Sequence, residues 1–197
     1  MQLYAQAEAT GRKAPAGSAR APWAMHPVAH VMEMQVRFTE RSAWLAQWQA
    51  DWTDGNGFQG HLGWHHTLFA LIDSGDLPAA RAWAASVAER AERAGGHARE
   101  AARDVSLPLM RGLLAFAEER FDDAVQPLYP LRAPAQRFGG SQAQRDLIDQ
   151  TVHAAAARAG NTAAGRALLN ERRLAKPATP LTEHWAACIA AAAHPST

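Results

Sequence analysis

Residues 77–94, LPAARAWAASVAERAERA, have the pattern of an amphipathic helix. Their small and apolar side chains recur every three or four positions, which places Leu77, Ala80, Ala84, Val87 and Ala91 in one continuous stripe. A stripe of this kind is removed from water only when it packs against a neighbouring helix. The segment therefore predicts a fold in which helices are stacked on one another.

The rest of the chain has the same helical character. It is rich in Ala, poor in β-branched residues, and apolar at intervals of three and four, without the alternation that is typical of strands. We therefore predict an all-α fold.

Four short turns resemble one another along the chain. Each is followed by an apolar residue and a helix of small residues, at Arg37–Phe38, Asp76–Leu77, Arg120–Phe121 and Asn161–Thr162. The second residues of these pairs are 39, 44 and 41 positions apart, further than the roughly 34 residues of a standard tetratricopeptide repeat. Three positions later, Ala80, Ala124 and Gly165 would let paired helices approach closely, whereas Arg41 breaks this pattern.

These turns predict tetratricopeptide-like, stacked antiparallel helical hairpins, an α-solenoid of about four degenerate pairs. The expected pairs are 23–35 with 38–52, 58–74 with 77–94, 106–118 with 121–136, and 142–159 with 162–172. A terminal helix at 182–193 would cap the array. Pro127, Pro130 and Pro134 predict a break or kink in the third pair, and Pro27 predicts that the first helix begins near His26 or bends there.

We expect two parts: a flexible segment, 1–22, containing a short helix, and a single helical-repeat domain, 23–194. The chain has 197 residues, with 20 basic and 19 acidic side chains and a net charge of +1. This balance favours neither nucleic acid nor an anionic membrane as a partner. Arg172 and Arg173 form a short basic run that we expect on a solvated face.

Cys188 is the only cysteine, so no intramolecular disulfide is expected, and its apolar neighbours predict a small buried side chain. The sequence lacks a cleavable leader pattern and an uninterrupted apolar run of about 18 residues. Together these features favour a cytoplasmic protein.

Several ordered blocks resemble the tetratricopeptide repeat protein 38 family, whose members are helical-repeat proteins of poorly defined activity. The resemblance spans residues 23–185, and its more specific blocks lie at 101–109 (AARDVSLPL), 139–146 (GGSQAQRD) and 171–182. Further blocks are WAMH at 23–26, HVMEMQ at 30–35 and the Trp64–His65 pair. The resemblance implies an abridged member, with the helices before residue 23 and after the second hairpin short or absent. Val36, Arg41 and Pro27 depart from the family pattern.

His26, His30 and Glu33 would lie on one stripe of an unbroken helix. His61 and His65 repeat the four-residue spacing on the expected helix 58–74, the first helix of the second pair. Imidazole and carboxylate groups at these spacings could bind zinc or iron. The alternative interpretation is that these histidines only satisfy polar groups between stacked helices.

Trp44, Trp48 and Trp52 share one arc of a helix and could line a peptide groove, or they could belong to the core. In the Gly139–Asp146 block, Ser141 would cap the helix that begins at Gln142, and Arg145 could hold an anion or bridge to a neighbouring helix. Arg103 and Asp104 are expected to form a buried or inter-helix ion pair.

Two hypotheses of function follow. The first is a non-enzymatic adaptor or scaffold that binds a protein or peptide and that could also form homo-oligomers. The second is a metal-dependent enzyme in which the two His pairs hold zinc or iron and Glu33 acts as a ligand or base.

Overall fold

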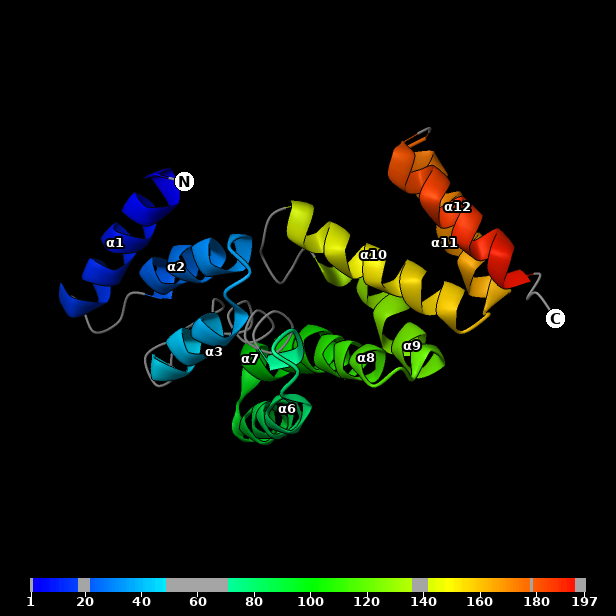
Figure 1. Ribbon diagram of the computed structural model, residues 1–197. Coiled ribbons are helices and arrows are strands. Elements are labelled where there is room, and N and C mark those ends of the chain that lie inside the picture. The colour runs from blue at the N-terminus through cyan, green and yellow to red at the C-terminus, as the bar shows by residue number, and fades with distance from the viewer. Residues whose placement is uncertain (1, 18–21, 49–70, 136–141, 178, 194–197) are drawn as a thin grey trace. The chain divides into compact units, whose positions relative to one another are not determined.

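A computed structural model of the chain describes residues 2–17, 22–48, 71–135, 142–177 and 179–193 (Figure 1). Within these ranges the backbone is helical apart from turns and short connections, and contains no strand, as the sequence predicts. The chain forms two compact units, Met1–Met110 and Arg111–Thr197. The single helical-repeat domain over 23–194 stays a prediction.

The first unit contains helices from the amino-terminal half of the chain. They are α1 (Gln2–Gly17), α2 (Pro22–Met34), α3 (Phe38–Gln47), α6 (Leu77–Arg93), α7 (Gly96–Ala101) and the π-helical turn η2 (Ala102–Ser106). Helix α2 contacts both α1 and α3, and α6 contacts α7 and η2. Buried side chains from α2 and α3, including Met25, Val28, Met32 and Leu45, form the core beside α2.

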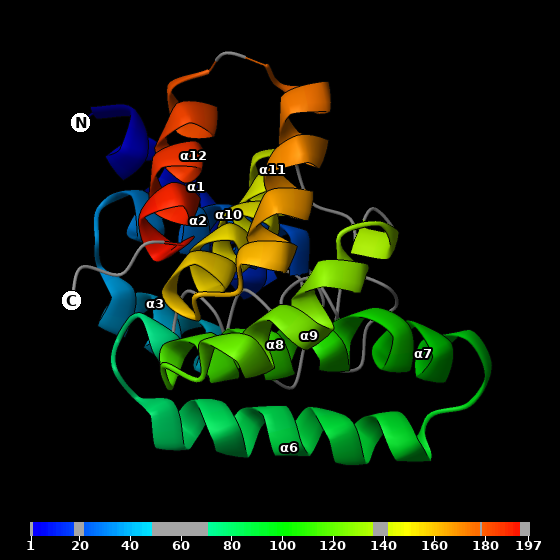
Figure 2. The same ribbon diagram turned by 90° about the vertical axis from the view of Figure 1, so that its right-hand side faces the viewer.

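The second unit begins within α8 (Leu107–Ala117) and continues through α9 (Phe121–Leu131), α10 (Gln142–Arg158), α11 (Thr162–Ala175) and α12 (Pro180–Ala193). Helix α10 contacts α9, α11 and α12, and α11 lies antiparallel beside α12 (Figure 2). Helices α8 and α9 approach so closely that a Cβ atom added at Gly112 would lie 2.4 Å from Cγ of Leu128.

The four predicted turns share one backbone geometry. The residue before each turn pair has a left-handed backbone, with φ of 59° at Val36, 79° at Gly75, 59° at Glu119 and 66° at Gly160. The next N–H donates to the carbonyl five residues earlier at 2.9 Å in every case: Arg37 to Met32, Asp76 to Leu71, Arg120 to Ala115 and Asn161 to Ala156. This is the Schellman arrangement, which ends a helix, and at each of these four places the next helix begins directly after it.

The residue four positions after Arg37, Asp76, Arg120 or Asn161 forms the same backbone hydrogen bond in all four repeats. The N–H of that residue donates to the carbonyl of Arg37, Asp76, Arg120 or Asn161, and the residue itself is buried in all four cases: Arg41, Ala80, Ala124 and Gly165. Ala80 and Ala124 are fully buried, in keeping with the close helix approach that the sequence predicts. Arg41 is also buried, where it forms an ion pair with Asp73 at 3.5 Å and lies over the Phe38 ring.

Most helix predictions agree with the structure, and three differences are informative. Helix α1 covers 16 residues and packs on α2, where we expected a flexible segment with a short helix. Helices α7 and η2 occupy residues 96–106, almost all of which lie between the predicted helices 77–94 and 106–118. The expected helix at 58–74 lies mainly outside the described residues.

The third difference concerns prolines that lie inside helices α2 and α9. Pro27 lies inside α2 with its side chain exposed, and the helix begins at Pro22. Of the two alternatives predicted for Pro27, a helix that begins near His26 was therefore wrong, and a bend at this residue stays a prediction. Pro127 and Pro130 likewise lie inside α9. Pro127 cannot donate a hydrogen bond to the carbonyl of Asp123, and Pro130 cannot donate one to the carbonyl of Gln126. Asp123 and Gln126 are both exposed, so water can replace the missing donors.

Candidate functional site

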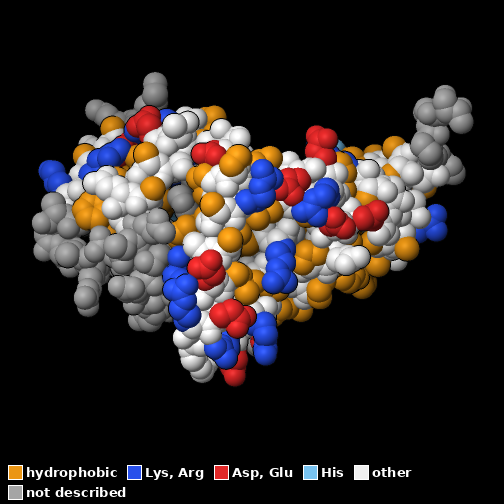
Figure 3. Space-filling model, turned by 90° about the horizontal axis from the view of Figure 1, so that it is seen from below, with side chains coloured by type: hydrophobic (Ala, Val, Ile, Leu, Met, Phe, Trp, Pro, Cys, Tyr) orange, Lys and Arg blue, Asp and Glu red, His pale blue; other side chains and the backbone are white. Residues whose placement is uncertain are grey.

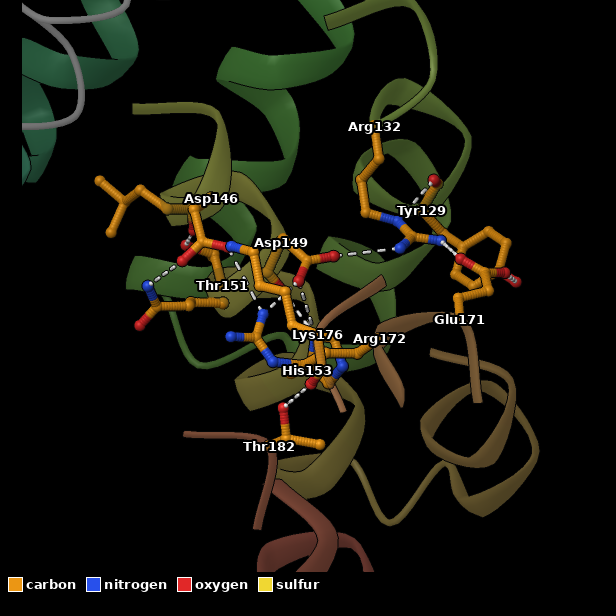
Figure 4. A network of polar contacts seen from close by, with 12 residues as sticks. Tyr129, Arg132, Asp146, Asp149, Thr151, His153, Glu171, Arg172, Lys176 and Thr182 are labelled. Carbon is orange, nitrogen blue, oxygen red and sulfur yellow. Dashed lines mark hydrogen bonds and ion pairs between the residues drawn. The ribbon is translucent and has the colours of Figure 1, made fainter. Parts of the chain in front are cut away.

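Charged side chains of the second unit gather where α9, α10 and α11 meet (Figure 4). On α10, Asp146, Asp149 and His153 are spaced three and four residues apart, which places them on one stripe of the helix. Arg132 follows α9, and Glu171 and Arg172 come from α11, with Lys176 immediately after it. We call these seven residues, together with Tyr129, the charged network.

Arg172 is the most enclosed cation of the network. Its side chain is only 4% exposed, and Nη1 lies 2.9 Å from Oδ2 of Asp149 and 3.4 Å from Oδ1 of Asp146. The same Oδ1 of Asp146 also pairs with Nζ of Lys176 at 2.8 Å. Two acidic groups of α10 are thus held between cations of α11 and the residue after it.

Arg132 connects α9 to both other helices. Its guanidinium pairs with Oδ1 of Asp149 at 3.1 Å and with Oε2 of Glu171 at 2.6 Å, and it lies over the Tyr129 ring. The Tyr129 hydroxyl donates to Oε1 of Glu171 at 2.8 Å. The Glu171 carboxylate of α11 therefore accepts one hydrogen bond from Tyr129 of α9 and another from Arg132, the residue that follows α9.

His153 is fully buried beneath the network. Its Nδ1 lies 2.7 Å from the backbone oxygen of Asp149, so Nδ1 carries the proton and donates, because a carbonyl oxygen can only accept. Its Nε2 is buried without a hydrogen-bond partner, and its ring centroid lies 5.5 Å from that of Trp185 on α12. The imidazole therefore links the charged network to the apolar contact between α10 and α12.

The network shifts the acidity of its members. Partial burial would raise the pKa of Asp146, but hydrogen bonds from Lys176 and Gln150 and the nearby cations outweigh it, so this pKa lies below its usual value. The pKa of Glu171 is lowered in the same way, with burial opposed by hydrogen bonds from Tyr129 and Arg132. The hydrogen bond to Glu171 is the main reason why the pKa of the Tyr129 phenol is raised.

Chemically, the network holds helices together. Three carboxylates are paired with three cations, so acid and base groups are balanced and already bonded to one another. A general acid or base needs a proton that it can exchange with a substrate, and a carboxylate held by two cations is a weak base. The geometry favours a clamp between α9, α10 and α11 over a catalytic centre.

Sequence reasoning missed the clamp, and Arg172 is a correction. We expected Arg172 and Arg173 on a solvated face; Arg173 is exposed, but Arg172 is buried. The signal was present, because Gly165, Leu168, Leu169 and Arg172 follow the helical spacing of one buried stripe. The charge of Arg172 concealed its place in that stripe.

Of the predicted metal ligands, the structure brings His26 and His30 together, with Nε2 atoms 2.9 Å apart. Glu33 lies in the same helix, α2, and His61 and His65 lie outside the described residues. In the described part of the chain, no three His, Cys, Asp or Glu side chains form a metal-binding group.

The predicted partner-binding residues have different surroundings. Trp44 is 6% exposed and donates from Nε1 to the Met25 carbonyl, which makes it part of the core. Trp48 is half-buried and stacks edge-on against Trp44, Arg145 is half-buried near the start of α10, and Trp52 lies outside the described residues. Helix α10 begins at Gln142 as expected, while its predicted cap, Ser141, is also outside.

Two smaller expectations concern Cys188 and the Arg103–Asp104 pair. Cys188 is partly buried against the cluster of Leu169, Trp185 and Ile189, with Sγ 3.6 Å from Nε2 of His184. Arg103 and Asp104 do form an ion pair, but both side chains are exposed, so the expected burial was wrong. The two side chains are neighbours in η2, and they reach each other across the exposed surface of this turn.

No protein-family model matches this chain, and no solved structure matches it either. The resemblance to the tetratricopeptide repeat protein 38 family stays a prediction from the sequence blocks. Among the described helices, none has both the length and the apolar character needed to cross a bilayer.

Proposed function

We propose that this chain is a helical-repeat scaffold that binds another protein and catalyses no reaction of its own. The observation that carries the proposal is the repeated turn, with the same left-handed residue and the same 2.9 Å hydrogen bond at four places. A turn that recurs along a chain is typical of helical hairpins that stack into an α-solenoid, although the intervals of 39, 44 and 41 residues are longer than the roughly 34 of a standard tetratricopeptide repeat.

The second unit supports this proposal through the way its hairpins are joined. Asn161 of the fourth turn caps α11 and donates from Nδ2 to Asp122, which follows the third turn. Arg158, near the fourth turn, lies over the rings of Phe116 and Phe121 on either side of the third. Contacts between neighbouring turns are what stacked repeats require, and we propose that α12 caps the stack.

The distribution of charge supports a protein partner. On the face shown in Figure 3, acidic and basic side chains are intermixed over the described residues. Binding to nucleic acid or to an anionic bilayer depends on clustered cations, whereas protein interfaces tolerate a mixed surface around a few anchoring side chains. Trp48, half-buried and next to Trp44, is the anchor that we propose.

The test begins with the purified chain as bait, and a captured protein is then purified and its Kd measured by calorimetry. We expect Trp48→Ala to weaken binding about tenfold or more, because aromatic anchors dominate binding energies. Arg173→Ala, an exposed residue of the second unit, serves as the matched control and should leave Kd unchanged.

Two results would contradict the scaffold. One is that no protein binds saturably. The other is that Trp48→Ala lowers the melting temperature while Kd stays the same, which would assign this side chain to folding alone.

A further inference from the structure

His26 and His30 form a close pair on α2. Their Nε2 atoms are 2.9 Å apart, and the two rings meet edge to face with centroids 4.4 Å apart. Both rings are half-buried. The helix that carries them is held by its buried residues Met25, Val28 and Met32, and it contacts α1 and α3.

The chemistry of two facing nitrogens is restricted. When both rings are neutral, one Nε2 must carry the proton that the other accepts. A metal ion needs the lone pair of both nitrogens, so the donating ring must carry its proton on Nδ1 instead. In a pair of neutral rings this change of tautomer releases no net proton, and the metal ion takes the place of the shared hydrogen.

The separation of the nitrogens indicates which metal ions fit. Two metal–imidazole bonds of about 2.0–2.1 Å that meet at a right angle separate the nitrogens by about 2.9 Å, whereas a tetrahedral angle requires about 3.3 Å. The observed 2.9 Å is a hydrogen-bond distance, and it also equals the separation of adjacent positions in a tetragonal site. Cu²⁺ and Ni²⁺ prefer that geometry, and Cu²⁺ binds nitrogen ligands most tightly of the divalent first-row ions.

We propose that His26 and His30 bind one divalent transition-metal ion of the Cu²⁺ class through their Nε2 atoms. Two imidazoles supply only part of a coordination shell, which water or a donor from a bound molecule would complete. The site bridges one turn of α2, so the bound ion stabilises this helix. It does not depend on the scaffold function, and either proposal can fail alone.

The experiment titrates Cu²⁺ into the full chain and measures binding by calorimetry and electron paramagnetic resonance. All samples carry Cys188→Ser, so that the thiol does not reduce the ion. The test variants are His26→Asn and His30→Asn. The controls are His97→Asn, which changes an exposed imidazole on α7, and His184→Asn, which changes one on α12.

We expect one ion per chain, a spectrum split by at least two imidazole nitrogens, and a higher melting temperature with the ion present. Each test variant should bind about tenfold or more weakly, since it loses one of two ligands, while both controls bind as the parent does. Equal affinity in His30→Asn and the parent would overturn the proposal. Should the test variants fail to fold, fewer than two coordinated nitrogens in the parent spectrum would overturn it.

Discussion

Arg172 and Arg173 are neighbours in sequence and have opposite surroundings, the first buried against Asp146 and Asp149 and the second exposed. Removing one partner of a buried pair typically costs about 3–5 kcal/mol. Because Asp146 keeps Lys176 and Asp149 keeps Arg132, we expect Arg172→Ala to lower the free energy of unfolding by about 2–3 kcal/mol. Arg173→Ala should change it by less than about 0.5 kcal/mol. Urea unfolding of the two variants checks this, and equal effects would contradict the clamp.

Gly112 of α8 is packed directly against Leu128 of α9. A Cβ atom there would overlap Leu128, which is fully buried and therefore has little room to move. We expect Gly112→Ala to destabilise the chain by about 1–3 kcal/mol, as overpacking of a core does. Gly95→Ala is the matched control, since nothing lies within 4 Å of the added atom. If calorimetric melting shows Gly112→Ala to be as stable as the control, α8 and α9 are not this close.

Single residues were where sequence reasoning failed most often. Arg172 was expected on a solvated face because of its charge, and Arg41 was expected to break the repeat because it is not small. Both are buried at helical spacings that apolar residues occupy in the other repeats. Pro27 was judged by its missing N–H, yet one lost hydrogen bond at an exposed position does not end α2. In each case packing or solvent access, which depends on distant parts of the chain, outweighed the local preference.

At the scale of elements, the turns were predicted at the correct residues because their chemistry is local. Asp76 and Asn161 cap the next helix, and Gly75 and Gly160 supply the left-handed residue. Helix α1 was not foreseen at its full length, because Gly11, Pro15 and Gly17 indicate a loop. Of the candidate site, only the contact of His26 with His30 followed from spacing; the charged network depends on how three helices meet.

The turns make a reciprocal prediction. Val36 and Glu119 are exposed and left-handed, a conformation that costs an L-residue roughly 1–2 kcal/mol, whereas glycine adopts it freely. We expect Val36→Gly and Glu119→Gly to raise the free energy of unfolding by about 0.5–1 kcal/mol after the larger chain entropy of glycine is deducted. Gly75→Ala and Gly160→Ala should lower it by about 1 kcal/mol. Chemical denaturation of the four variants would disprove a shared turn if all four changes had the same sign.

At the scale of the whole molecule, stability should depend on acidic pH. The pKa values of Asp146 and Glu171 are lower in the folded chain than their usual values, so their pairing stabilises the fold above roughly pH 5 and is lost as pH falls through the folded values. We expect the melting temperature to fall from pH 5 toward pH 2, and Asp146→Asn with Glu171→Gln to make this dependence shallower. An unchanged pH profile in the double variant would show that these carboxylates are not paired.

Amide hydrogen exchange, followed residue by residue by NMR, tests most directly whether one turn is used four times. The N–H groups of Arg37, Asp76, Arg120 and Asn161 lie in connections between helices, yet each donates to a carbonyl at 2.9 Å. If the same turn occurs at all four places, all four amides should exchange at least about tenfold more slowly than in an unstructured peptide. Exchange of these four amides at the unstructured rate, while the interiors of the adjoining helices remain protected, would contradict it.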